Sequence, residues 1–270
     1  MLLLQLRAAE GQAGGAELGR RGAELGRRGD LESHRYLLDR LRRLRPHDAV
    51  LSEEAADDAG RLGASRVWIV DPLDGTREYG EPARTDWAVH VALAVEGHIS
   101  AGAVALPARG LTLSTDASPS SASRVSEALR IVVSRTRPPV WADEVAARIG
   151  AELVPMGSAG AKAAAVVLGE ADAYLHDGGQ HEWDSAAPVG VALAYGLHAS
   201  RADGSDLVYN QPLPWLPDLV ICRAAIASRL LDEVSAARAA LSSRRAATQR
   251  AGARSSGSPA RRPAPARSPR

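Results

Sequence analysis

The segment VWIVDPLDGTREY, residues 67–79, constrains this chain more than any other part of it. Its apolar residues 67–70 predict a short buried strand, and two aspartates, Asp71 and Asp74, follow at the end of that strand. Pro72 biases Asp71 towards an extended conformation and stiffens the turn. Two carboxylates held so close together repel each other and raise the pKa of one of them. The segment therefore predicts that a divalent cation binds between them.

The residues after the two aspartates indicate a phosphate as well as a metal ion. Carboxylates are hard oxygen ligands of the kind that Mg²⁺ prefers. Gly75 lets the backbone approach a ligand, and Thr76 is expected to begin a helix whose free N–H groups can hold a phosphate. The alternative is a turn stabilised by hydrogen bonds from the aspartates themselves. The complete hexad DPLDGT behind a strand favours the metal-and-phosphate site.

The length and the cysteine content of the chain indicate its general class. The chain has 270 residues and a single cysteine, Cys222. A chain of this length can bury a sufficient core without cross-links, and one cysteine excludes an internal disulfide framework. No apolar run approaches the roughly 20 residues that span a bilayer, and the N-terminal MLLLQLRAAEG lacks the basic start and the cleavage site of a signal peptide. We therefore expect a cytoplasmic protein without a membrane partner.

Charge is distributed unevenly along the chain. The formal net charge is +1, but residues 241–270 carry eight arginines and no acidic residue, which leaves −7 for residues 1–240. The C-terminal segment is rich in Ser, Pro, Ala and Arg and lacks apolar periodicity, so we expect a disordered basic tail. Its arginines could contact RNA or an acidic surface, but such runs without aromatic residues more often form a solvated extension. Because the body is acidic, we expect no specific nucleic-acid partner.

Hydrophobic periodicity predicts the order of helices and strands. The repeat AELGRRG occurs at 16–22 and again at 23–29, and because glycine interrupts helices we expect a flexible loop there. An alternating segment, residues 86–106, predicts a hairpin of two strands. Hairpins come first, and strands alternating with helices follow, which predicts an α+β half joined near residue 128 to an α/β half. Further strands are predicted at 129–134 and 218–222, and helices at 31–44, 141–149, 161–170, 184–200 and 224–241.

Three segments resemble the signatures of one phosphatase superfamily. DPLDGT is accompanied by the acidic LSEEAADD at 51–58 and by EWDSAAP at 182–188. This is the order found in the Mg²⁺-dependent, lithium-sensitive inositol monophosphatases, fructose-1,6-bisphosphatases and 3'(2'),5'-bisphosphate nucleotidases. The resemblance covers roughly residues 1–235. It implies a layered αβαβα fold and hydrolysis of a small phosphorylated substrate with two to three Mg²⁺ ions. Superfamily members begin with a longer first helix, so this chain is expected to start inside that helix.

The resemblance also implies how the chain is divided. Residues 1–128 would form an N-terminal α+β half with an antiparallel sheet, which carries most of the metal ligands. Residues 129–240 would form a C-terminal α/β half with the substrate contacts and the last metal ligand, and residues 241–270 would form the tail. A homodimer is compatible with the family, and the sequence leaves the oligomeric state open.

The residues after the hexad indicate the subfamily. Arg77-Glu78-Tyr79 resembles the Lys/Arg-Glu-Phe of CysQ-type bisphosphate nucleotidases, and GSAGAK at 157–162 resembles the nucleotidase segment that brings a lysine to the substrate. Mycobacterial CysQ proteins look most similar. This implies removal of the 3'-phosphate of adenosine 3',5'-bisphosphate to give AMP, which recycles a by-product of sulfur assimilation. The alternatives are an inositol or fructose bisphosphate phosphatase, and a truncated homologue that binds nucleotide or metal without turnover.

The resemblance assigns the metal ligands. Glu53 corresponds to a residue that ligates one metal and positions the attacking water. Asp71 corresponds to the carboxylate that bridges two metals, and Leu73 to a ligand through its backbone carbonyl. The ligands of the second metal correspond to Asp74 and Asp184.

Two further residues correspond to groups that act on the attacking water. Thr76 matches the threonine that orients it, and Asp30 matches an aspartate assigned to a third metal or to water activation. Asp30 precedes a predicted helix, so a helix N-cap is the alternative for this residue and equally for Asp184. Glu54 is expected to be structural.

The substrate contacts are predicted mainly in the second half. Lys162, the only lysine of the chain, lies near the start of a predicted helix, where the helix dipole disfavours a cation unless an anion binds. The alternative is a solvated lysine. Ser158 would add a hydroxyl contact to the same phosphate or to the ribose, and Arg137 corresponds to a position where nucleotidases place a histidine against the nucleotide. The predicted substrate-binding set is completed by Gly75, Thr76 and Asp184. The histidines are expected to be surface or structural residues: His34, His47, His90, His98, His176, His181 and His198.

Overall fold

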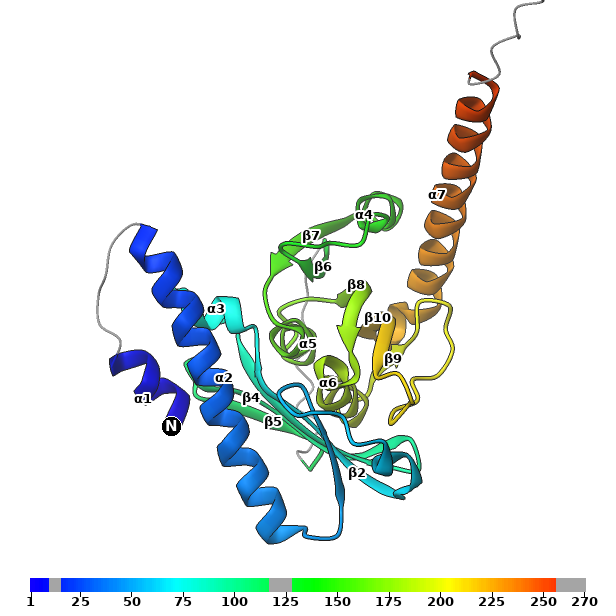
Figure 1. The fold of residues 1–270 in the computed structure, drawn as a ribbon. Coiled ribbons are helices and arrows are strands. Elements are labelled where there is room, and N and C mark those ends of the chain that lie inside the picture. The colour runs from blue at the N-terminus through cyan, green and yellow to red at the C-terminus, as the bar shows by residue number, and fades with distance from the viewer. Residues whose placement is uncertain (10–15, 117–127, 256–270) are drawn as a thin grey trace, which may run out of the picture.

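The computed structural model describes residues 1–9, 16–116 and 128–255, and its helices and strands form five layers. Two five-stranded sheets are separated by a layer of helices, and further helices cover the outer face of each sheet (Figure 1). The predicted αβαβα layering is therefore confirmed. None of the helices in the described ranges is long and apolar enough to cross a membrane.

The first sheet has the order β1-β2-β3-β4-β5. The predicted hairpin is present as β3 and β4, and its turn contains Glu96 and Gly97, both with positive φ. The sheet is mixed and not purely antiparallel as expected, because β1 runs parallel to β2. This pairing brings the ends of both strands to one edge, so that Glu53 follows β1 beside Asp71 of β2. The strands are β1 (Ala49–Ser52), β2 (Arg66–Asp74), β3 (Ala88–Val95), β4 (His98–Leu106) and β5 (Leu111–Ser114).

The second sheet has the order β7-β6-β8-β10-β9. Strands β7, β6 and β8 are parallel, whereas β10 runs antiparallel to both of its neighbours. Strand β8 was not predicted from the sequence, because its Gly178-Gly179 pair, with positive φ at both residues, breaks the alternating pattern. The strands are β6 (Leu129–Ser134), β7 (Ala151–Met156), β8 (Ala173–His181), β9 (Leu197–Ser200) and β10 (Trp215–Arg223).

Three apolar clusters hold the layers together. The largest lies between the sheets and includes side chains of α5 (Ala159–Val167) and α6 (Glu182–Ala194). A second joins the far face of the second sheet to α4 (Ala142–Ile149) and α7 (Ala227–Ser255). A third, smaller cluster joins α1 (Leu2–Ala9) and α2 (Ala16–Leu44) to β2 and to the short α3 (Thr76–Gly80). The 3₁₀ helices are η1 (Ala59–Gly63), η2 (Pro107–Arg109) and η3 (Ala224–Ile226).

The loop predicted for the AELGRRG repeat is wrong, because α2 runs without a break from Ala16 to Leu44. The helix accommodates Gly22, Gly26 and Gly29 because this face of α2 lies against α3. A Cβ atom on Gly22 would lie 2.7 Å from the carbonyl oxygen of Gly80, and one on Gly26 would lie 2.9 Å from that of Thr76. Only residues without side chains allow the two helix backbones to approach this closely.

Two predicted boundaries at the C-terminal side also change. The helix expected at 184–200 ends at Ala194, because Gly196 with positive φ terminates it and β9 follows. The tail expected from residue 241 begins inside α7, which continues to Ser255 because the segment is rich in the helix formers alanine and arginine. Residues 256–270 lie outside the described ranges, so disorder there stays a prediction.

The division into two halves stays a prediction as well. All strands of the first sheet precede residue 116, and all strands of the second follow residue 128. The expected junction falls on residues 117–127, outside the described ranges. Helices α5 and α6 of the second half pack against strands of the first sheet, so the two halves share one apolar core.

Candidate functional site

Three aspartates from both halves of the chain meet at one point. One carboxylate oxygen each of Asp71, Asp74 and Asp184 lies within 4.8 Å of the other two. The first two lie at the end of β2, where a register shift against β3 separates them, and Asp184 lies in the first turn of α6. The fold therefore brings the segments DPLDGT and EWDSAAP together.

The predicted turn is present at Asp71, whereas Asp184 is not the N-cap of α6 but the third residue of a capping box whose N-cap is His181. Neither arrangement excludes a metal site. Asp71 Oδ1 accepts a hydrogen bond from the N–H of Leu73 at 3.0 Å. Asp184 Oδ2 accepts one from the N–H of His181 at 2.7 Å, which caps α6. In each case one oxygen is used locally, and a carboxylate has further lone pairs for a cation.

The charges of this cluster are not balanced. Burial, followed by repulsion from Asp74, raises the pKa of Asp71 well above 3.8 and that of Asp184 to about 7. Burial of its carboxyl group, followed by repulsion from Asp30, raises the pKa of Glu53 to about 7, although the residue as a whole is exposed. Several buried oxygen ligands without enough positive charge suit a hard divalent cation. The donor set therefore fits the metal that the sequence predicts.

Asp74 differs from its neighbours because it is hydrogen-bonded on several sides. Its Oδ2 accepts from the hydroxyl of Ser158 and, at 2.7 Å, from the N–H of Gly160. Burial alone would raise its pKa, but His90 and Lys162, together with the Ser158 hydroxyl, lower it below 3.8. Asp74 therefore stays ionised and joins the first half of the chain to the start of α5.

The predicted water-activating residues form a second group behind the aspartates. Asp30 lies in the middle of α2 and is buried, so the N-cap alternative for it is wrong. Thr76 Oγ1 lies 3.0 Å from the carbonyl oxygen of Leu73 and 3.4 Å from Asp30 Oδ2, and Asp30 Oδ1 has no hydrogen-bond partner. Burial, followed by repulsion from Glu54, raises the pKa of Asp30 to about 7. The group therefore contains a carboxyl that can exchange a proton near neutral pH.

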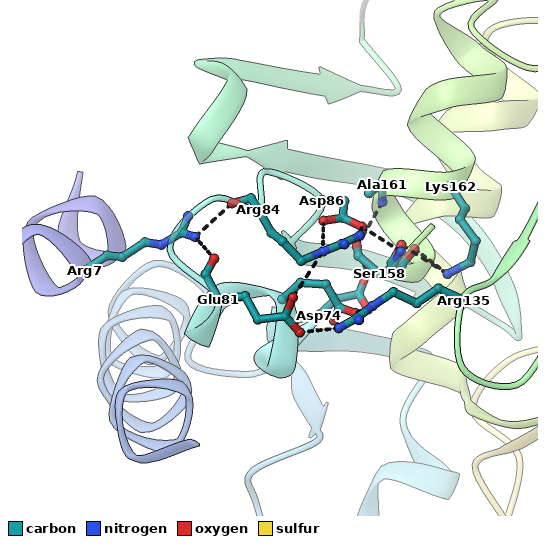
Figure 2. Close-up of polar contacts among 11 residues, drawn as sticks. Arg7, Asp74, Glu81, Arg84, Asp86, Arg135, Ser158, Ala161 and Lys162 are labelled. Atoms are coloured by element: carbon teal, nitrogen blue, oxygen red, sulfur yellow. Dashed lines mark hydrogen bonds and ion pairs between the residues drawn. The ribbon is translucent and has the colours of Figure 1, made fainter. Parts of the chain in front are cut away.

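Lys162 is buried, so the solvated alternative is wrong. Its exposure is 4%. Its Nζ donates to the carbonyl oxygens of Ser158 at 2.6 Å and Gly157 at 3.3 Å and lies 5.1 Å from the ring centroid of Tyr174 (Figure 2). An ammonium has three N–H donors, and two of them are used in this way. The third has no hydrogen-bond acceptor among the described residues, and the ring of Tyr174 lies beside the ammonium.

A polar network anchors the turn before α5 to the first half. Asp86 accepts from the N–H of Gly157 at 2.7 Å and from Nε of Arg84 at 2.7 Å. Arg135 donates to Glu78 at 2.6 Å and to Glu81 at 2.5 Å. Figure 2 shows these contacts continuing from Arg7 of α1 to the turn before α5. The position of this turn, and so of the groups around Asp74, is fixed from several elements.

One polar pocket of about 220 Å³ collects the predicted substrate residues. Arg137 lies at its exposed side, and no carboxylate pairs with it within the described part of the chain. The pocket also contains Arg77, Arg135 and the buried His176, which were not predicted as substrate contacts. All six predicted substrate-binding residues line this pocket: Gly75, Thr76, Arg137, Ser158, Lys162 and Asp184.

His90 belongs to the site although the sequence indicated a surface or structural histidine. It is fully buried on β3 directly opposite Asp71. Its Nε2 lies 3.3 Å from Asp74 Oδ2, and its Nδ1 lies 3.1 Å from the carbonyl oxygen of Trp183. Gly160 makes room for it, since a Cβ there would lie 2.1 Å from Nε2. The alternating pattern gave no signal for His90, because it places this residue on the face opposite Val89 and Val91, where a polar residue is expected.

Comparisons with known proteins agree with this geometry. The model of the inositol monophosphatase family matches residues 5–242. The 3'-phosphoadenosine 5'-phosphate phosphatase of Mycobacterium tuberculosis (strain CDC 1551 / Oshkosh) is 52% identical over 242 residues, which cover 87% of this chain and 88% of that protein. The protein of the same name from Mycobacterium leprae (strain TN) is 56% identical over 210 residues, 73% of this chain and 78% of that one. The crystal structure of CysQ from Bacteroides thetaiotaomicron superposes with a TM-score of 0.62 at 24% identity, covering 72% and 83% of the two chains.

Proposed function

The chain belongs to the inositol monophosphatase family, and on that premise we propose that it is a Mg²⁺-dependent 3'(2'),5'-bisphosphate nucleotidase. Its substrate is adenosine 3',5'-bisphosphate, from which it removes the 3'-phosphate to give AMP. The observation that carries the proposal is a pocket lined both by Asp74 and Asp184 of the aspartate cluster and by the cations Lys162 and Arg137. Such a pocket offers carboxylates that would hold metal ions at the phosphate that is cleaved, and cations for a phosphate that is kept. The names of the mycobacterial relatives support the same substrate.

Two to three Mg²⁺ ions would be held by the carboxylate cluster. Asp71, Asp74 and Asp184 are the central ligands, and Glu53 and the carbonyl oxygen of Leu73 extend the set. When bound, the ions would stabilise the negative charge of the phosphoryl oxygens and of the leaving oxygen. The hydrogen bonds from Ser158 and Gly160 hold Asp74 so that its other oxygen remains for a ligand.

Asp30 and Thr76 would handle the proton of the attacking water. The unpartnered Oδ1 of Asp30 is an acceptor, and its pKa of about 7 suits a general base at neutral pH. The Thr76 hydroxyl lies between Asp30 and the Leu73 carbonyl and orients the water. Water then attacks phosphorus, the bond between phosphorus and the ribose 3'-oxygen breaks, and that oxygen leaves with a proton as the 3'-hydroxyl.

Lys162 and Arg137 would hold the phosphate that is not cleaved. Both residues line the pocket, and no carboxylate pairs with Arg137 among the residues that the structure describes. The Ser158 hydroxyl donates its proton to Asp74 and accepts from the N–H of Ala161 at 3.0 Å. One lone pair remains, which can accept from a ribose hydroxyl but does not bind a phosphate. A cytoplasmic location, a homodimer and the absence of a specific nucleic-acid partner stay predictions.

The test is phosphate release from a small panel of substrates. The full chain is assayed with Mg²⁺ on adenosine 3',5'-bisphosphate, inositol 1-phosphate and fructose 1,6-bisphosphate, and then with added Li⁺. We expect the highest kcat/KM for adenosine 3',5'-bisphosphate and inhibition by Li⁺. A higher kcat/KM for either of the other substrates would reject the nucleotidase. Absence of turnover on all three would instead identify a homologue that binds without catalysis.

A further inference from the structure

Two buried acceptors in the pocket have no donor. His176 and Gln180 lie on β8, are each 5% exposed and line the pocket together with Asp184. Among the described residues, His176 Nε2 and Gln180 Oε1 have no hydrogen-bond partner, whereas Gln180 Nε2 donates to the hydroxyl of Tyr174 at 2.7 Å. A buried polar atom without a partner costs about 1–3 kcal/mol. Two such atoms on residues that line one pocket indicate that a ligand supplies the donors.

His176 lines the pocket, and its Nε2 is buried without a partner among the described residues. Burial, followed by Lys162 and then Arg137, lowers its pKa to about 4, so the ring is neutral at neutral pH. A hydrogen bond with the backbone of Gly178 raises the pKa, which means that a ring N–H donates to the carbonyl oxygen. We assign this N–H to Nδ1, because Nε2 has no partner among the described residues. In this tautomer Nε2 is an acceptor.

Two acceptors, His176 Nε2 and Gln180 Oε1, disfavour binding of a phosphate beside them and favour a neutral hydrogen-bond donor. A phosphate has acceptor oxygens only, and it would repel both the lone pair of His176 and the amide oxygen of Gln180. The cations Lys162 and Arg137 in the same pocket serve that purpose instead. Hydroxyl and amino groups are the neutral donors that a nucleotide offers. Of these, the ribose 2'-hydroxyl lies next to the ester that is cleaved, and so nearest to the aspartate cluster.

We propose that His176 Nε2 and Gln180 Oε1 accept hydrogen bonds from a neutral donor of the substrate, the ribose 2'-hydroxyl, and thereby make the enzyme selective for ribonucleotides. The proposal rests on the proposed function, because it names a contact of that substrate. It adds a specificity determinant to the pocket. The substrate has a second neutral hydrogen-bond donor that could satisfy the same acceptors, which is the adenine 6-amino group.

Substrate analogues that lack one donor each test the proposal. Initial rates are measured with Mg²⁺ on adenosine 3',5'-bisphosphate, on its 2'-deoxy analogue and on the purine riboside 3',5'-bisphosphate, which lacks the 6-amino group. The wild-type kcat/KM should fall about 5- to 100-fold for the 2'-deoxy analogue, since the acceptors are left unpaired. It should be nearly unchanged for the purine riboside. A loss on the purine riboside instead would assign the same acceptors to the adenine amino group.

Variants at position 176 link the selectivity to the histidine. His176→Phe keeps a ring without an acceptor and should reduce the preference for the ribonucleotide towards unity. His176→Gln places an amide oxygen near the position of Nε2 and should restore much of it. His198→Phe is the matched control, because His198 lies on β9 outside the pocket and contacts Ser200. If His176→Phe does not fold, the wild type and His176→Gln still give the comparison.

Three results would overturn the inference while leaving the nucleotidase intact. They are equal kcat/KM of the wild type on all three bisphosphates, an unchanged preference in His176→Phe, and a loss in His176→Phe that appears only when the substrate carries a 5'-phosphate. The last is measured against adenosine 3'-monophosphate. If the wild type fails to hydrolyse adenosine 3',5'-bisphosphate, the proposed function fails. Inositol 1-phosphate and its analogue without the vicinal hydroxyl then decide the inference separately.

Discussion

Asp71 and Asp74 lie three positions apart at the end of one strand, but their surroundings give them different properties. Asp71 is buried and lies among other carboxylates, and both effects raise its pKa well above 3.8. Asp74 faces His90 and Lys162, which outweigh the effect of burial and lower its pKa. Replacing either residue removes a proposed metal ligand, whereas the effect on the fold should differ.

We expect Asp71→Asn and Asp74→Asn each to abolish phosphate release from adenosine 3',5'-bisphosphate. An amide keeps the shape of the side chain but removes the charge that holds the cation. Rates at saturating Mg²⁺ provide the measurement. Asp39→Asn is the control, because Asp39 is exposed on α2 and pairs with Arg43 away from the pocket. Turnover like that of the wild type in either active-site variant would contradict the metal-ligand assignment.

The same two variants should shift the melting temperature of the metal-free protein in opposite directions. Asp71→Asn relieves repulsion and should raise it, whereas Asp74→Asn leaves His90 and Lys162 without a counter-charge and should lower it. Asp71 has a folded-state pKa above its unfolded value, so its ionisation destabilises the fold increasingly as pH rises above about 4. The gain from Asp71→Asn in EDTA should therefore grow between about pH 5 and pH 8. Thermal unfolding in EDTA checks the direction of both shifts. With Mg²⁺, Asp71→Asn should lower the melting temperature instead of raising it, because the variant lacks a proposed metal ligand.

Lys162 should contribute to binding of the phosphate that is not cleaved. Lys162→Met keeps most of the packing of this buried side chain and removes its charge. Charge-assisted hydrogen bonds contribute about 1.5–3 kcal/mol, so KM for adenosine 3',5'-bisphosphate should rise by about one to two decades. Inositol 1-phosphate has no second phosphate and should be affected much less. Equal losses on both substrates would show that Lys162 serves the turn at Gly157 and Ser158, whose carbonyl oxygens it contacts.

The site residues that the sequence could indicate are those that lie within short motifs. Asp71 and Asp74 share one hexad, and Lys162 lies in another short segment. His90 and His176 belong to no motif, because their relation to the site depends on pairing across strands. His90 lies opposite Asp71 only in the register that β2 and β3 adopt. That register follows from packing of the whole sheet, so a local pattern could not give it.

At the scale of elements, α2 shows how a tertiary contact overrides local propensity. Each glycine in a helix costs about 1 kcal/mol relative to alanine, and this cost led to the prediction of a loop. The repeat has a period of seven residues, however, so Gly22, Gly26 and Gly29 recur on one face of the helix. That face packs against α3, and the close approach places Asp30 behind Thr76. The seven-residue spacing was the signal that could have indicated a helix.

The two copies of the repeat provide a matched pair of substitutions. Gly19 and Gly26 occupy the same position in their copies, but a Cβ on Gly19 meets nothing within 4 Å, whereas one on Gly26 would lie 2.9 Å from the Thr76 carbonyl oxygen. Gly19→Ala should therefore raise the melting temperature by about 2–4 °C through helix propensity. Gly26→Ala should lower it by roughly 5 °C and reduce kcat, since it displaces Thr76. Equal shifts for the two variants would show that α2 does not pack against α3 in this way.

At the scale of the molecule, the five layers were predictable only through the resemblance to a family. Periodicity alone indicated hairpins followed by alternating strands and helices, and it missed β1, β5, β7, β8 and β9. These strands are short, exposed at sheet edges or broken by glycines, so they carry little alternating pattern. The shared core of the two halves could not be read locally either, because it forms where α5 and α6 lie between the two sheets.

The C-terminal segment should be dispensable for catalysis although part of it is helical. Helix α7 contacts the second sheet through Leu230, Val234 and Ala237, and in Figure 1 it then extends away from the body. Beyond residue 240, the described side chains include Arg244, whose ion pair with Glu144 at 3.7 Å is exposed. Exposed pairs contribute about 0–1 kcal/mol.

Truncation after residue 240 should therefore leave kcat and KM unchanged and lower the melting temperature by at most about 4 °C. Truncation after residue 229 is the contrasting variant, because it removes the three buried residues of α7 and should prevent stable folding. The full chain should bind RNA nonspecifically at low salt more strongly than the shorter one, and the difference should disappear as salt rises, since arginine–phosphate attraction depends on counterion release. A lower kcat in the protein truncated after residue 240 would mean that the arginines reach the active site or an interface that supports it.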